Sequence, residues 1–267
     1  MKSIKGVLFD LDGVFYVGNK LIPGGNETLA WLRAQGIGYR FVTNNTTLSR
    51  SALVAKLQHL GLDISENELL SANYAGVVQL QKMGLTRCRL VLAAAAQTDY
   101  PPAVEDDPEA IVVGDIGNDW NYDLLNSLMN QLLEGAELIA LHKGRYFQTD
   151  EGLMLDSGAF VAALEHATGK KAHVVGKPSA AFFEMGSALL KGAANELLMV
   201  GDDLINDIEG AQNAGYHAVL VQTGKYRKAL LEQSPITPDG IMASIAALPS
   251  YLSTLKSNRT KNGLFLL

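Results

Sequence analysis

Short apolar runs alternate along the chain with segments whose apolar positions recur at helical spacing. The apolar runs predict strands at residues 4–9, 39–45, 89–93, 110–115, 137–142, 172–176, 196–202 and 217–223. The helical spacing predicts helices at residues 26–36, 48–61, 65–84, 122–135 and 179–192. Strands that alternate with helices usually pair in parallel through right-handed crossovers. The pattern therefore predicts an α/β fold built on parallel sheets.

Three segments interrupt this alternation. Residues 96–110, AQTDYPPAVEDDPEA, combine tandem prolines with an acidic cluster and predict a solvated loop. Residues 13–24 follow the first predicted strand and predict a flap over its end, with a plain surface hairpin turning at Gly18-Asn19 as the alternative. Residues 256–267, KSNRTKNGLFLL, predict a loose C-terminal tail.

Composition and charge argue against several classes of partner. The chain has 267 residues, a net charge of −6 and a single cysteine, Cys88. A negative net charge disfavours nucleic acid, because phosphate backbones attract basic surfaces. A lone cysteine forms no internal disulfide, and no stretch approaches the ~20 apolar residues of a membrane span. We therefore expect a cytoplasmic protein that binds neither nucleic acid nor membrane.

Polar and charged residues follow four of the predicted strands at the point where each strand ends. They are Asp10 and Asp12, Thr43 and Asn44, Lys177, and the group Asp202, Asp203 and Asp207. Ligands of a parallel α/β sheet bind at the carboxyl ends of its strands. Each of these short motifs alone is a common turn or helix cap. Four of them, each closing an apolar strand, predict one shared site.

Several carboxylates at one sheet edge repel each other unless a cation lies among them. Oxygen ligands favour Mg²⁺, which proteins usually hold through a few carboxylates together with water and phosphate oxygens. A lysine and a hydroxyl group beside such an ion would complete a site for a phosphate group. One aspartate could then act as a nucleophile that forms an aspartyl-phosphate, and a second could serve as acid and then as base.

These motifs make the chain resemble the haloacid dehalogenase (HAD) superfamily of phosphatases. The matching segments are FDLDGV (9–14), FVTNN (41–45), VVGKP (174–178) and VGDDLINDIEGAQNAG (200–215). The long interval between the second and third segments resembles the NagD-like subfamily, which carries a large α/β cap there, and LIALHKGRYF (138–147) and VQTGKYR (221–227) fit the same branch. The resemblance implies a doubly wound parallel-sheet (Rossmann-like) core at residues 1–78 and 173–267, with an inserted α/β cap domain at residues 79–172.

The resemblance also implies roles for the acidic residues. Asp10 would be the nucleophile and a Mg²⁺ ligand. Asp12 would be the general acid/base, and its backbone carbonyl would also contact the metal. Asp202 would complete the metal site. Asp203 and Asp207 would lie behind these ligands and orient them or their waters.

By the same resemblance, Thr43, Asn44 and Lys177 would hold the phosphoryl group during its transfer. Phosphoryl transfer needs in-line positioning and neutralised oxygen charge, which this set of residues can supply. The resemblance therefore implies a Mg²⁺-dependent phosphatase that hydrolyses a small phosphorylated metabolite through an aspartyl-phosphate. Because related enzymes often pair through the cap, it also implies a homodimer.

The predicted cap contains two basic residues that bear on the substrate. NagD-like enzymes often have an Asn-Pro-Asp-type stretch where this chain has HKGRY (142–146). The resemblance therefore does not extend to their nucleotide or sugar substrates. Lys143 and Arg145 favour a substrate with additional negative charge, such as pyrophosphate. The alternative is that both are ordinary solvated surface residues.

Other classes of protein are alternatives to the phosphatase. A phosphoacceptor signalling domain of the response-regulator type also combines an acidic metal site with a lysine, but its acidic pair precedes the acceptor aspartate. Here the acidic segment GDD comes after Lys177. A non-catalytic phosphate-binding protein of the same fold would not require Asp12. A dehalogenase would not require it either, since attack on a carbon–halogen bond needs no proton for the leaving group.

Overall fold

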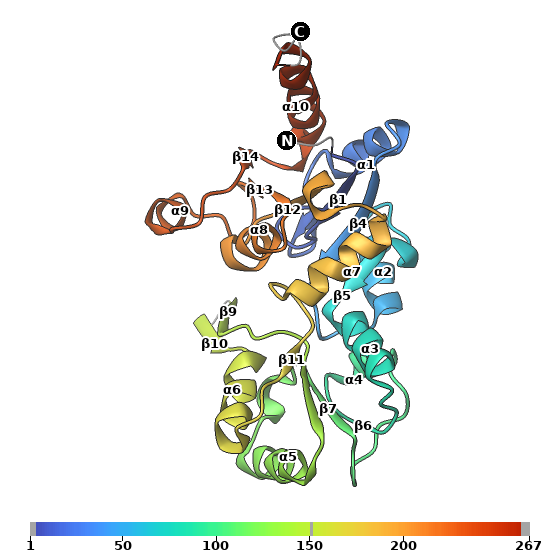
Figure 1. The fold of residues 1–267 in the computed structure, drawn as a ribbon, viewed down its shortest axis with the longest axis vertical. Helices are drawn as coiled ribbons and strands as arrows, with labels where there is room; N and C mark the ends of the chain where they lie inside the picture. Colours follow the sequence, from blue (N-terminus) through green and yellow to red (C-terminus); the bar gives the residue numbers. More distant parts are fainter. Residues whose placement is uncertain (1–3, 150–151, 263–267) are drawn as a thin grey trace. The chain divides into compact units, whose positions relative to one another are not determined.

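The computed structural model describes residues 4–149 and 152–262 (Figure 1). Contacts divide the chain into two compact units, which are described separately below. The first comprises Met1–Thr43, Ala55–Leu69 and Phe183–Leu267, and the second comprises Asn44–Val54 and Leu70–Phe182. The expected core and cap bounds stay a prediction, because these units reflect contacts and not independent folding.

The larger sheet has six strands. Their order is β14 (Gly240–Met242), β13 (His217–Val221), β12 (Leu197–Gly201), β1 (Gly6–Phe9), β4 (Gly38–Thr43) and β5 (Leu69–Ser71). Strand β1 pairs in parallel with both β12 and β4, and β13 pairs in parallel with β12 and β14. Every residue of β1, β12 and β13 is buried, as is usual for parallel strands covered on both faces. The predicted parallel α/β fold is confirmed.

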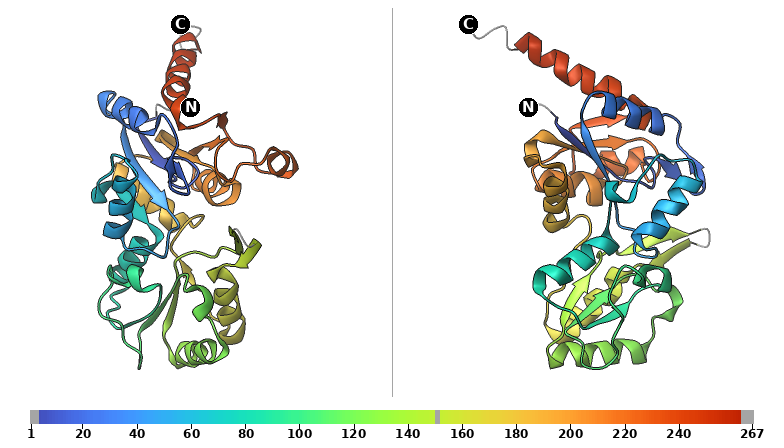
Figure 2. Two further views of the ribbon diagram at one scale, coloured as in Figure 1. Left: turned by 180° about the vertical axis from the view of Figure 1, so that it is seen from behind. Right: turned by 90° about the vertical axis from the view of Figure 1, so that its right-hand side faces the viewer.

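Helices and helical turns connect these strands. They are α1 (Gly25–Ala34), α2 (Arg50–His59), η1 (Glu66–Glu68), α7 (Ala180–Leu190), η3 (Ala194–Glu196), the π-helix η4 (Leu204–Glu209), α8 (Gly210–Asn213), α9 (Lys228–Gln233), η5 (Ile245–Ala247) and α10 (Leu248–Asn262). Helix α10 packs against α1 (Figure 2). Within residues 4–149 and 152–262, no helix combines the length and apolar character needed to cross a membrane.

A hairpin follows β1, at the position where the sequence predicts a flap or a surface hairpin. Strands β2 (Tyr16–Val17) and β3 (Lys20–Leu21) pair antiparallel, and Gly18 at the turn has a φ of 59°, a conformation that favours glycine. Phe15 anchors the hairpin, because its buried ring packs edge-on against Phe9 at 5.2 Å and Phe41 at 5.1 Å. The hairpin is confirmed, and its role as a flap stays a prediction.

The second unit contains a smaller parallel sheet. Its order is β11 (His173–Val174), β8 (Glu137–Ala140), β7 (Ala110–Val113) and β6 (Cys88–Val91). The other elements are α3 (Ala72–Met83), α4 (Ala94–Gln97), η2 (Gly117–Asp119), α5 (Tyr122–Glu134), the antiparallel hairpin of β9 (Tyr146–Thr149) and β10 (Gly152–Leu155), and α6 (Ser157–Thr168). The strands predicted near 89–93, 110–115, 137–142 and 172–176 are therefore confirmed.

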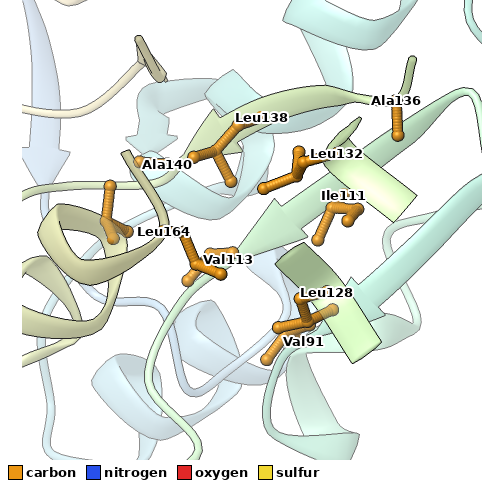
Figure 3. Packing of buried hydrophobic residues seen from close by; sticks show 10 residues of the cluster. Val91, Ile111, Val113, Leu128, Leu132, Ala136, Leu138, Ala140 and Leu164 are labelled. Atoms are coloured by element: carbon orange, nitrogen blue, oxygen red, sulfur yellow. The ribbon is translucent and has the colours of Figure 1, made fainter. Parts of the chain in front are cut away.

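Helices α5 and α6 pack against each other and share an apolar core with the smaller sheet (Figure 3). Leu128 and Leu132 of α5 meet Ile111 and Leu138 of the sheet, and all four are 0% exposed. Such burial stabilises the unit by about 1.5–3 kcal/mol for each large side chain.

We expect Leu128→Ala to lower the free energy of unfolding by about 2–5 kcal/mol, because it removes buried contacts and leaves a cavity. Chemical denaturation measures this loss. Leu133, on the same helix, is 59% exposed, so Leu133→Ala is the matched control and should change stability by under about 0.5 kcal/mol. Equal losses in both variants would contradict this assignment of the core.

Two local predictions are wrong. The helix predicted at 65–84 is interrupted by β5, the edge strand of the larger sheet. Leu69 and Leu70 are buried there, so pairing with the sheet overrides the helical pattern. The tail predicted from residue 256 continues α10 to Asn262. Buried Leu248 and Leu252 anchor the first turns of α10, and each further residue then adds one helical hydrogen bond at low cost. Residues 263–267 lie outside the described part of the chain.

Candidate metal and active site

Strand β1 carries Asp10 to the end of the larger sheet. The Asp10 backbone N–H donates to the carbonyl of Val200 at 2.9 Å and so extends the pairing of β1 with β12 by one residue. The Leu11 backbone N–H donates to Oδ1 of Asp10 at 2.8 Å and orients its carboxylate, which belongs to a buried residue. Because β12 ends beside β1, the loop that follows β12 begins next to Asp10.

Three carboxylates meet at this place. One ligand oxygen each from Asp10, Asp202 and Asp207 lies within 4.8 Å of the others, and all three residues are buried. Asp207 reaches the group from η4, and its Oδ2 accepts the backbone N–H groups of Asp202 at 3.2 Å and Asp203 at 3.1 Å. Asp207 thus belongs to the carboxylate group and also holds the loop that carries Asp202.

The chemistry of this donor set fits a hard divalent cation. Three buried carboxylates at such separations repel each other strongly in a medium of low dielectric constant. A cation among them relieves that repulsion, and a set made only of oxygen atoms is the type that Mg²⁺ prefers. The residues present therefore fit the ion expected from the sequence.

Asp12 lies on the turn that follows Asp10, and its side chain is not part of the three-carboxylate group. Partial removal of the carboxyl group from water raises the pKa of Asp12, and the negative charge of Asp10 raises it further, whereas Lys225 acts in the opposite direction. The residue as a whole is exposed, so solvent screens part of these effects. Asp12 is thus a carboxyl group beside Asp10 whose pKa lies above its ordinary value.

Asp203 has a different position from its neighbour Asp202. Its Oδ1 accepts the backbone N–H groups of Ile205 and Asn206, each at 3.0 Å, which caps η4. Its Oδ2 lies 3.0 Å from Nζ of Lys225. Burial raises the pKa of Asp203, but Lys225 and the hydrogen bonds outweigh burial and leave it below the ordinary value. Asp203 therefore shapes the loop and has no place in the three-carboxylate group.

The expected phosphate-binding residues fall on two elements. Thr43 is the last residue of β4, which pairs with β1, and it is buried. Asn44 and Lys177 belong to the second unit, where the Asn44 amide joins both backbone groups of Lys177: Nδ2 donates to the carbonyl and Oδ1 accepts the N–H, each at 2.8 Å. Lys177 is 2% exposed. Asn44 and Lys177 are therefore neighbours, and their role stays a prediction.

The two basic residues of the predicted cap differ in their surroundings. Lys143 Nζ lies 2.6 Å from Oε2 of Glu165, a carboxylate that is 10% exposed. This pairing lowers the pKa of Glu165 despite the opposing effect of burial. Arg145 is exposed. Lys143 is therefore engaged within its own unit, which makes Arg145 the better candidate for contact with an anion.

The loop after β13 is a part of the site that the sequence motifs do not identify. The Lys225 backbone N–H donates to Oδ2 of Asp202 at 2.7 Å, and the Thr223 hydroxyl donates to the carbonyl of Gly13. A Cβ atom built on Gly13 or on Gly224 would overlap Oδ2 of Asp202. The signal available in the sequence is the segment VQTGKYR, which by itself indicates only the subfamily.

Comparisons with known proteins identify the family of this chain. Residues 7–100 match a family described as haloacid dehalogenase-like hydrolase, and residues 174–248 match a second family of HAD-hydrolase-like proteins. The chain is 40% identical over 240 residues to haloacid dehalogenase-like hydrolase domain-containing protein 2 of Bos taurus, covering 89% of this chain and 90% of that protein.

Two further proteins are similar over nearly the whole chain, and both are named phosphatases. Phospholysine phosphohistidine inorganic pyrophosphate phosphatase of Homo sapiens is 36% identical over 252 residues, covering 92% of this chain and 93% of the relative. The solved structure of a p-nitrophenyl phosphatase from Archaeoglobus fulgidus superimposes with a TM-score of 0.85 at 28% identity, covering 92% of this chain and 98% of the other.

These similarities confirm the resemblance expected from the four motifs and the expected α/β class. The matched regions include the segments that carry Asp10 and Asp202, and the identity to curated relatives extends through the interval between the motifs. The chain therefore belongs to the haloacid dehalogenase-like hydrolase family, and it is a phosphatase of that family.

Proposed function

We propose that this phosphatase is Mg²⁺-dependent and hydrolyses a small phosphorylated metabolite through an aspartyl-phosphate on Asp10. The observation that carries the proposal is the buried group of Asp10, Asp202 and Asp207, with Asp12 two residues after Asp10. This group combines a candidate nucleophile, a set of cation ligands and a neighbouring acid/base. The fixed orientation of the Asp10 carboxylate by the Leu11 N–H supports its role as nucleophile.

In the first step, a carboxylate oxygen of Asp10 forms a bond to phosphorus while the bond from phosphorus to the leaving oxygen breaks. Protonated Asp12 donates its proton to that leaving oxygen, so the alcohol departs neutral. In the second step, Asp12 accepts a proton from water as the water oxygen bonds to phosphorus. The bond from phosphorus to Asp10 then breaks, which releases inorganic phosphate and restores Asp10.

The remaining residues hold the reacting group. Asp10, Asp202 and the backbone carbonyl of Asp12 would hold Mg²⁺, and Asp207 would steady the Asp202 backbone beside it. Once bound, Mg²⁺ would supply positive charge that offsets the charge of the phosphoryl oxygens. Thr43 and the joined pair of Asn44 and Lys177 would bind those oxygens; this assignment rests on the family resemblance.

The substrate class is a small phosphorylated metabolite, and pyrophosphate is a specific candidate. The name of the human relative, an inorganic pyrophosphate phosphatase, supports this candidate. Exposed Arg145 offers a cation for a second phosphate group. A phosphoacceptor domain and a non-catalytic binding protein are disfavoured, because the relatives described above are named hydrolases and phosphatases.

The proposal predicts that p-nitrophenyl phosphate is hydrolysed with Mg²⁺ present and that a chelator removes the activity. We expect the rate to fall to near background with chelator and to return when excess Mg²⁺ is added, because the carboxylate group needs a cation to accept a phosphate dianion. Release of inorganic phosphate measures both rates. A rate that is the same with and without chelator would rule out the Mg²⁺ dependence.

A further inference from the structure

The loop that follows β13 touches both of the loops that carry the acidic residues. Its Thr223 hydroxyl donates to the carbonyl of Gly13, in the turn that follows Asp10 and Asp12. Two residues later, the Lys225 backbone N–H donates to Oδ2 of Asp202 at 2.7 Å. One tripeptide, residues 223–225, therefore joins the turn after β1 to the carboxylate after β12.

We propose that Thr223 and Gly224 are positioning residues that hold the Asp202 carboxylate beside Asp10 and so set the affinity of the site for its divalent cation. This inference rests on the proposed function, because it takes Asp10 and Asp202 as ligands of Mg²⁺. It adds two residues from a loop that lies outside that carboxylate group. We call residues 223–225 the clasp.

The sheet alone does not orient the Asp202 carboxylate. The pairing of β1 with β12 ends with the bond from the Asp10 N–H to the Val200 carbonyl, and Asp202 lies two residues beyond that carbonyl. Asp207 accepts the backbone N–H of Asp202 and so fixes its main chain. The N–H of Lys225 donates directly to the Asp202 side chain, so the position of the clasp helps to determine where Oδ2 lies.

Close packing makes this arrangement specific to glycine. A Cβ atom on Gly224 would overlap both Oδ2 of Asp202 and Cα of Gly13. A Cβ atom on Gly13 would overlap the same carboxylate from the other loop. The Asp202 carboxylate thus packs between the backbones of two glycines. A methyl group added to either glycine would displace this carboxylate from Asp10 and Asp207.

The charge of Lys225 acts on Asp10 and Asp202, but its ion pair is with Asp203. Its side chain is 66% exposed, and its ammonium group pairs with Asp203, which lies outside the three-carboxylate group. Exposed ion pairs contribute little because water and salt screen them. The proposal therefore assigns positioning to the Thr223 hydroxyl and to the backbone of Gly224 and Lys225.

The first test is Mg²⁺ binding to the substrate-free, full-length protein, measured by isothermal titration calorimetry. We expect Thr223→Val to raise the Mg²⁺ dissociation constant about tenfold, the scale seen when a residue that supports metal ligands is lost. Thr223→Ser keeps the hydroxyl and should stay within about twofold of wild type. Thr28→Val is the matched control, because Thr28 also donates a buried hydroxyl hydrogen bond to a backbone carbonyl, that of Ile245.

The second test separates the packing of Gly224 from its backbone conformation. Gly224 has a φ of +61° and Gly36 has a φ of +64°, but a Cβ atom on Gly36 meets nothing within 4 Å. Alanine at either position thus carries the same backbone strain. We expect Gly224→Ala to weaken Mg²⁺ binding at least tenfold and Gly36→Ala to leave it within about twofold of wild type.

Thermal melts of the metal-free proteins accompany both tests and check that each variant is folded. The proposal is overturned if folded Thr223→Val binds Mg²⁺ as wild type does, or if Thr28→Val and Gly36→Ala weaken binding as much as the clasp variants. Failure of the proposed function is a separate result: wild-type protein that binds Mg²⁺ but releases no phosphate from p-nitrophenyl phosphate would refute the phosphatase mechanism and leave the calorimetric comparison of the clasp intact.

Discussion

Asp10→Asn is expected to lower phosphatase turnover by roughly 10⁴-fold or more, because an amide cannot attack phosphorus and no other group replaces the nucleophile. The substitution preserves shape. Asparagine keeps a carbonyl oxygen that can accept the Leu11 N–H, as Oδ1 of Asp10 does at 2.8 Å. It also removes one of three crowded negative charges, so we expect no loss of stability in the metal-free protein.

Two measurements make this result specific to the proposed mechanism. After a short reaction with p-nitrophenyl phosphate and rapid quenching, mass spectrometry should detect phosphate on the Asp10 peptide of wild type and none in the variant. The control is Asp63→Asn, which alters an exposed carboxylate in the same unit and should leave turnover unchanged. Near-wild-type turnover in Asp10→Asn would exclude Asp10 as the nucleophile.

Asp12→Asn is expected to slow turnover by roughly 10²–10⁴-fold, which is the usual contribution of a general acid/base. The size of the loss should depend on the leaving group. p-Nitrophenolate departs readily without a proton, whereas an alkoxide departs only with one, so an alkyl phosphate should lose more rate than p-nitrophenyl phosphate. Steady-state kinetics with both substrates measures this difference.

This dependence separates proton transfer from a purely structural effect. If Asp12 only shaped the turn around Gly13, the rates with both substrates would fall by the same factor. A change in the turn would not depend on whether the leaving group needs a proton. An equal loss for the two leaving groups would therefore remove Asp12 from the acid/base role while leaving the assignment of Asp10 untouched. A melting curve close to that of wild type would show that the variant is folded.

Strands β1 and β12 were predictable from the sequence because all their residues are buried and therefore appear as continuous apolar runs, and β4 contains the shorter buried apolar run of Phe41 and Val42. The runs that lead to Asp10, Thr43 and Asp202 are β1, β4 and β12, each ending within two residues of the predicted place. The capping box of Ser65 and Glu68 joins residues three apart, so it depends only on the local sequence. Strand β5, directly after it, was missed because its pairing partner lies elsewhere in the chain.

The sequence also identified the chemistry of the site, because several carboxylates placed directly after buried strands repel each other unless a cation offsets their charge. It did not establish how close together they lie. Asp207 was expected behind the ligands, and its helix η4 brings its carboxylate within 4.8 Å of those of Asp10 and Asp202, while its role toward a metal stays a prediction. A π-helix changes which side chains face inward, and no spacing rule in the sequence indicates that it forms.

By itself, then, the sequence determined the α/β class, the family and the candidate carboxylates, because these depend on local apolar runs and short motifs. Only the tertiary structure decided that Asp207 joins the cluster and that Asp203 caps η4. It also decided that Thr223 reaches Gly13, a residue 210 positions away in the chain. Such contacts depend on how loops far apart in the chain meet at the end of a sheet, and the local sequence pattern does not indicate which loops meet.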